Sequence, residues 1–62
     1  MAKQYKVKIT DDIEYYRAST LTTLREEMLN EMAKDGFVLL TTATTDKRLI
    51  DTFVRDDEKF AD

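Results

Sequence analysis

The chain has no cysteine, no histidine, no proline and a single glycine in its 62 residues. Disulfides are therefore excluded, and a zinc site would lack its usual nitrogen and sulfur ligands. The commonest general base and the commonest thiol nucleophile are both missing. One glycine is also too few for a glycine-rich phosphate-binding loop. We therefore expect no enzymatic activity, no cofactor and no metal site.

Long apolar runs are absent as well. No segment approaches the roughly 18 apolar residues of a membrane span, and the opening "MAKQYKVKIT" lacks the apolar core of a signal peptide. The lack of cysteine fits a reducing compartment. These features predict a soluble, cytoplasmic protein that does not act on membranes.

The charge is nearly balanced, with 13 acidic and 10 basic residues and a net charge of −3. General nucleic-acid binders usually show clustered positive charge, so this balance argues mildly against that class. The length predicts one domain over residues 1–62, with residues 56–62 as an acidic, frayed tail. A chain this short buries only about 60% of its unfolded surface, so a partner subunit is one common source of further stability.

Four segments have the composition of β-strands. Residues 3–9 alternate between apolar and polar side chains, and residues 13–19 are rich in β-forming types. Residues 37–44 and 48–55 follow a helical segment and read as a hairpin. We expect an α+β fold in the order β-β-α-β-β, a four-stranded antiparallel sheet with one helix on one face.

Residues 19–36 predict the helix, because their apolar side chains recur at helical spacing. This apolar stripe contains Leu21, Leu24, Met28, Leu29 and Met32. Arg25 projects into the stripe near its start, where a long side chain can still reach water.

Both ends of this helix carry signals. Thr23 followed by Glu26 fits a capping box, with Ser19, Thr20 and Thr22 as alternative caps. Gly36 suits the left-handed position after the helix, with Phe37 folding back on Met32.

One helix can cover only one face of such a sheet, yet apolar side chains occur on both sides of the strands. An even-length first turn would place Val7 opposite Tyr16. The helix-facing set is then Tyr5, Val7, Ile9, Tyr16, Ala18, Phe37 and Leu39. The outer set is Ile13, Tyr15, Val38 and Leu40 with either Leu49 and Phe53 or Ile50 and Val54, depending on the last turn.

This outer set predicts a protein interface, because monomers rarely expose a large contiguous apolar patch. Its anchors would be Tyr15, Val38, Leu40, Leu49 and Phe53. Self-association is the first expectation, since homodimers are the commonest oligomers. The chain would then be a small protein-binding regulator or inhibitor. An irregular last strand or a covering loop would instead hide part of this face.

Two further interpretations use charge. Lys6, Lys8 and Arg17 around Tyr15 on the first hairpin could form a charged rim of the protein interface. Alternatively, they could form an anion contact that binds nucleic acid. Lysines on an edge strand also serve to limit aggregation. The helix acids Glu26, Glu27, Glu31 and Asp35 could face a basic partner, although such charges are commonly only solvated.

The segment "LNEMAKDGFVLL" resembles the central motif of a family of small, uncharacterised bacterial and phage domains with the order β-α-β-β. Tyr5-Lys6-Val7, Leu29-Asn30 and Gly36-Phe37 with Leu39 match that pattern. The family usually has Trp and Glu where this chain has Phe37 and Val38, and "IEYYRAST" reads as an inserted strand. The resemblance supports the fold but suggests no particular activity, because the family has no clear biochemical role. Short, acidic, cysteine-free domains also resemble phage accessory proteins that bind one host protein.

Overall fold

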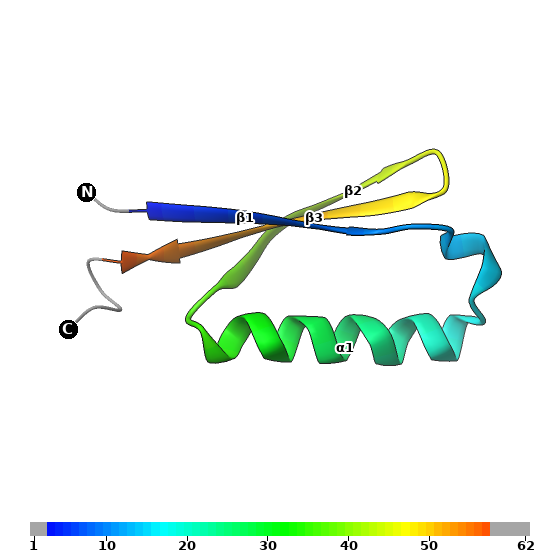
Figure 1. The fold of residues 1–62 in the computed structure, drawn as a ribbon, viewed down its shortest axis with the longest axis horizontal. Helices are drawn as coiled ribbons and strands as arrows, with labels where there is room; N and C mark the ends of the chain where they lie inside the picture. The colour runs from blue at the N-terminus through cyan, green and yellow to red at the C-terminus, as the bar shows by residue number, and fades with distance from the viewer. Residues whose placement is uncertain (1–2, 58–62) are drawn as a thin grey trace.

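The structure, a computed structural model, describes residues 3–57 as a three-stranded antiparallel sheet with one helix packed along it (Figure 1). The elements are β1 (Lys3–Thr10), the short 3-10 helix η1 (Ile13–Tyr15), α1 (Ala18–Lys34), β2 (Val38–Thr45) and β3 (Arg48–Asp56). The spatial order is β1-β3-β2, so the last strand is the central one. In Figure 1 the helix forms a second layer on one side of the sheet, and no described element lies on the other side.

The prediction of a four-stranded sheet in the order β-β-α-β-β is wrong, because residues 13–19 do not form a strand. Asp12 adopts a left-handed conformation (φ 52°), and one 3-10 turn follows over Ile13–Tyr15. The amide of Ile13 donates a hydrogen bond to the carbonyl of Lys47 at 3.0 Å, which attaches this turn to the connection between β2 and β3. The chain therefore passes from β1 into α1 without a second strand, and the order is β-α-β-β.

The remaining strands lie where the sequence predicts them. β1 pairs with β3 along its whole length, from Lys3↔Asp56 to Thr10↔Leu49. β2 pairs with the other edge of β3 and carries an irregularity between Leu39 and Thr41. Since β1 and β2 are both antiparallel to β3, they run in the same direction, which the intervening helix makes possible.

The start of the helix differs from the prediction. α1 begins at Ala18 after Arg17, whose side chain makes no capping hydrogen bond. The Thr22 and Thr23 hydroxyls donate to the carbonyls of Ala18 and Ser19 one turn earlier. Thr23 therefore lies within the helix, and the capping box predicted there is wrong.

The end of the helix is as predicted. Gly36 has φ 86°, a conformation that costs other residues about 1–2 kcal/mol. Its amide donates to the Ala33 carbonyl at 3.0 Å, and the Phe37 amide donates to the Met32 carbonyl at 3.0 Å. These two hydrogen bonds are the Schellman pattern. Phe37 consequently packs on Met32, directly before β2 begins at Val38.

The core is small and lies between α1 and the sheet. It consists of the buried Met32, Phe37 and Phe53, with Met28 and Leu29 partly buried against them. No helix within residues 3–57 has the length and apolar character needed to cross a membrane. Of the predicted acidic tail, Asp56 is the last residue of β3, and residues 58–62 lie outside the described residues.

Candidate protein-interaction face

The side chains of the central strand β3 alternate between the two sides of the sheet. Asp51 and Phe53 are fully buried on the side that faces α1. Arg25 of α1 donates to the Asp51 carboxylate, which establishes that direction. Ile50, Thr52 and Val54 therefore point to the side without a helix.

The neighbouring strands continue this helix-free surface, because directly paired residues share one face of a sheet. On β1, Tyr5, Val7 and Ile9 pair with Val54, Thr52 and Ile50 of β3. Tyr5, Val7 and Ile9 are each 57% exposed. On β2, Val38, Thr41 and Ala43 pair with the same three residues. We call this surface the open face: Tyr5, Val7, Ile9, Val38, Thr41, Ala43, Ile50, Thr52 and Val54.

The open face reverses one prediction. Tyr5, Val7 and Ile9 were expected to face the helix, and they face away from it. The cause is the register of β1 on β3, which places Lys6 opposite Phe53 and Lys8 opposite Asp51. β1 is an edge strand, and long lysine side chains beside the helix can keep their ammonium groups in water.

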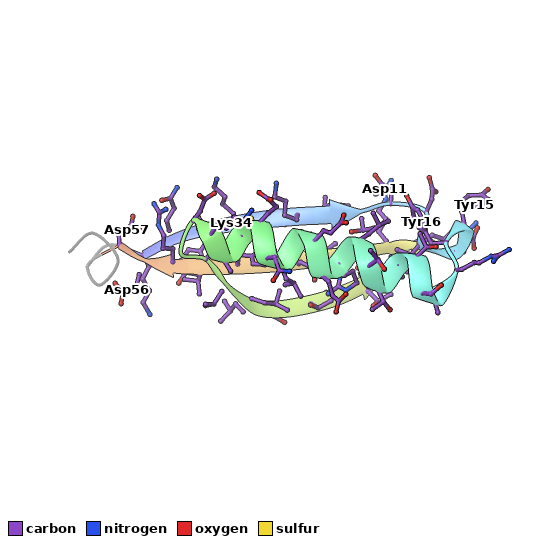
Figure 2. The ribbon with its side chains drawn as sticks, turned by 90° about the horizontal axis from the view of Figure 1, so that it is seen from below. Asp11, Tyr15, Tyr16, Lys34, Asp56 and Asp57 are labelled. Atoms are coloured by element: carbon purple, nitrogen blue, oxygen red, sulfur yellow. The ribbon has the colours of Figure 1, made fainter. Side chains whose placement is uncertain are left out.

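Charged residues lie only at the two ends of this surface. At the hairpin end, Arg48 Nε lies 2.7 Å from the Asp11 carboxylate. At the other end, Lys3 and Asp56 are cross-strand neighbours. Figure 2 shows these ends, with Asp11 beside the tyrosines and Asp56 at the opposite end of the molecule. Between the two ends, the open face carries no charged side chain.

The five residues predicted as interface anchors are not all brought together. Val38 is 63% exposed on the open face, and Leu40 is exposed at the irregularity of β2. Tyr15 is exposed on η1 at the end of the molecule where α1 begins (Figure 2).

The outward orientation predicted for Leu49 and Phe53 is wrong. Leu49 is half-buried on the helix side, and Phe53 is completely buried. The turn between β2 and β3 contains only Asp46 and Lys47, and it directs the alternative pair Ile50 and Val54 outward.

The three predicted rim cations also lie elsewhere. Lys6 and Lys8 are on the helix side of β1, and Arg17 is at the start of α1. The Lys6 ammonium lies 5.3 Å from the centroid of the Phe37 ring. The expected cross-strand pairs, Lys6 with Arg17 and Lys8 with Tyr15, do not exist because the first hairpin does not form.

A buried ion pair joins α1 to the sheet on the helix side. The Arg25 guanidinium donates two hydrogen bonds to Asp51, at 2.9 and 3.1 Å, and the Thr42 hydroxyl donates a third at 2.7 Å. Burial by itself would raise the pKa of Asp51, but these hydrogen bonds and the nearby positive charge outweigh it and lower the pKa. The hydrogen bond to Asp51 raises the pKa of Arg25. The pair therefore remains ionised.

The sequence contains a signal for this pair that the predictions did not use. Arg25 interrupts the apolar stripe of the helix, and Asp51 interrupts the apolar side of the last strand. Opposite charges at two such positions suggest that the residues meet, because an isolated buried charge is costly.

Arg55 forms a second connection on the helix side. It donates to the Asp35 carbonyl after α1 at 2.9 Å and to Gln4 Oε1 of β1 at 2.8 Å. Its guanidinium carbon lies 4.8 Å from the centroid of the Phe37 ring. The charged contacts between helix and sheet are thus concentrated on the side opposite the open face.

Residues 3–57 bring no group of three acidic side chains together as a metal site would require. The resemblance to small bacterial and phage domains stays a prediction. Comparisons with protein-family models, curated proteins and solved structures found no match to this chain.

Proposed function

We propose that this chain is a non-enzymatic protein-binding module, a small regulator or inhibitor, and that its open face contacts the partner. One observation carries this proposal: Tyr5, Val7, Ile9 and Val38 are each more than half exposed on a sheet side that no described element covers. They adjoin Ile50 and Val54 of the central strand. Contiguous apolar surfaces of this kind on small proteins commonly mark interaction sites.

The open face suits an apolar partner better than a charged one. Complete burial of an aliphatic or aromatic side chain contributes roughly 1.5–3 kcal/mol, so one already half covered has about 1 kcal/mol left to gain. Six such side chains provide roughly 6 kcal/mol, whereas association costs about 4–15 kcal/mol. Binding at micromolar concentration needs about 8 kcal/mol net. The partner must therefore contribute apolar surface of its own.

Nucleic acid is a poorer fit to this face. Phosphate groups are bound mainly by lysine and arginine, and the middle of the open face has neither. Lys6 and Lys8 lie on the opposite side of β1, so the arrangement expected for nucleic-acid contact is not formed. The proposed binding function therefore concerns proteins, and the cysteine-free sequence fits action in the cytoplasm.

Photocrosslinking in cells that produce the chain tests this proposal. A benzophenone amino acid at Val7 should form an adduct with a protein, whereas the same probe at Glu27, exposed on α1, should form little. Introducing Val38→Glu into the Val7 probe variant should remove the adduct, because it places a charge on the same face. Circular dichroism would confirm that each variant keeps its helix. Equal labelling from both probe positions, or none from Val7, would refute the proposal.

A further inference from the structure

We propose that the protein bound at the open face is a second copy of this chain, stacked sheet against sheet with the two β3 strands antiparallel. This inference rests on the proposed function, because it names the occupant of the same face. It is supported by the exposed area, by the shape of the sheet and by the placement of charges at its ends.

Exposed apolar surface is concentrated on the open face. Tyr5, Val7 and Ile9 are each 57% exposed, and Val38 is 63% exposed. A second copy would cover these side chains on both molecules at once, which doubles the apolar area buried. The helix already covers the other side of the sheet (Figure 1), so a second copy on the open face would complete a layered sandwich.

The shape of the open face suits another copy of itself. Three strands of about eight residues make a surface roughly 26 Å long and 14 Å wide. Two such sheets pack about 10 Å apart with their strands nearly aligned. In an antiparallel two-fold arrangement the axis passes near Thr52, so Ile50 of one copy faces Val54 of the other. Tyr5 of one copy likewise faces Ile9 of the other, and apolar side chains meet along the whole face.

The charges at the two ends select the antiparallel arrangement. Reversing one copy brings its Arg48 toward Asp56 of the other copy and its Lys3 toward Asp11. The two-fold axis repeats both contacts, so four pairs of opposite charge flank the apolar middle. The parallel alternative would instead place Arg48 over Arg48 and Asp56 over Asp56, which is repulsive.

Sedimentation equilibrium over micromolar concentrations tests whether the second copy is present. The expected mass is twice 7.3 kDa, falling to 7.3 kDa for Val7→Glu with the helical circular dichroism signal retained. The matched control is Thr44→Glu, because Thr44 is an exposed β2 residue on the helix side, opposite Leu49. That control should remain dimeric. A wild-type chain that stays monomeric throughout overturns the inference.

A charge exchange tests the orientation of the two copies. The double variant Lys3→Glu and Asp56→Lys keeps opposite charges at that end of the chain, but it turns all four intermolecular pairs repulsive in the antiparallel dimer. Dimerisation should weaken at least about tenfold. Adding Asp11→Lys and Arg48→Glu should restore it. Unchanged dimerisation of the double variant overturns the antiparallel arrangement.

These results separate the inference from the function on which it rests. Dimeric mass together with Val7 adducts only between copies supports both. A monomer whose Val7 probe labels a different protein overturns the second copy as occupant and retains the binding function. A monomer without Val7 adducts overturns both.

Discussion

The Arg25–Asp51 pair predicts unequal effects of its two single substitutions. The Asp51 side chain is fully buried, whereas the Arg25 side chain is 22% exposed. Arg25→Met leaves the carboxylate buried with one hydrogen bond, from Thr42, and removal of one partner of a buried pair costs about 3–5 kcal/mol. Asp51→Asn leaves the guanidinium with access to water and keeps an acceptor near Thr42, so we expect a cost of about 1–2 kcal/mol.

These costs are large for a domain of this size. At about 0.05–0.15 kcal/mol per residue, the whole chain is stable by roughly 3–9 kcal/mol. Arg25→Met should therefore unfold much of the protein, and Asp51→Asn should leave it folded. Arg25→Met combined with Asp51→Leu should recover most of the loss, because an apolar pair carries no desolvation penalty.

Urea unfolding followed by circular dichroism at neutral pH gives the free energies for all four chains. The three variants must be compared at one protein concentration, since dimerisation would add to the apparent stability. If Asp51→Asn costs as much as Arg25→Met, or if both cost less than about 0.5 kcal/mol, the carboxylate is not a buried charge that depends on Arg25.

Three further predictions concern the buried core, the end of the helix and the acid titration of Asp51. Phe53→Ala should lower the free energy of unfolding by about 3–5 kcal/mol in urea titrations, because it empties a fully buried site; a loss below about 1 kcal/mol would contradict the burial. Gly36→Ala should cost about 1–2 kcal/mol in thermal unfolding because of its φ of 86°, while Asp35→Ala, at φ −93°, should cost clearly less. The lowered pKa of Asp51 means that the unfolded chain takes up a proton at a higher pH than the folded chain. The stability from this group is thus complete above the unfolded pKa of about 4 and lost as pH falls through the folded value, and Asp51→Asn should flatten that part of an acid titration.

Local signals in the sequence predicted the helix, its stop at Gly36 and three of the strands. Each of these features depends on residues that are close in sequence. Glycine tolerates the left-handed conformation at the helix end, and residues 3–9 alternate between apolar and polar side chains. The predicted strand at residues 13–19 failed because β-propensity describes how well a segment fits a sheet, and here β1 takes its partner from β3.

The candidate site was only partly predictable, because it also depends on pairings between residues far apart in the sequence. The sequence indicated more apolar surface on the strands than one helix can cover, and Val38 and Leu40 are exposed as predicted. It did not determine that Phe53 would be core, and the two interrupting charges, Arg25 and Asp51, suggested a pair that the predictions did not use. Both features depend on how the helix is placed over a strand more than twenty residues away.

Alternation alone determined that Tyr5, Val7 and Ile9 share one side of their strand, because successive side chains of a strand point in opposite directions. Only the tertiary structure decided which side that is. The register of β1 on β3 and the position of α1 over Asp51 and Phe53 direct those three residues away from the helix. Such long-range pairings are set by the whole chain, and here they leave an apolar sheet face that no described element covers.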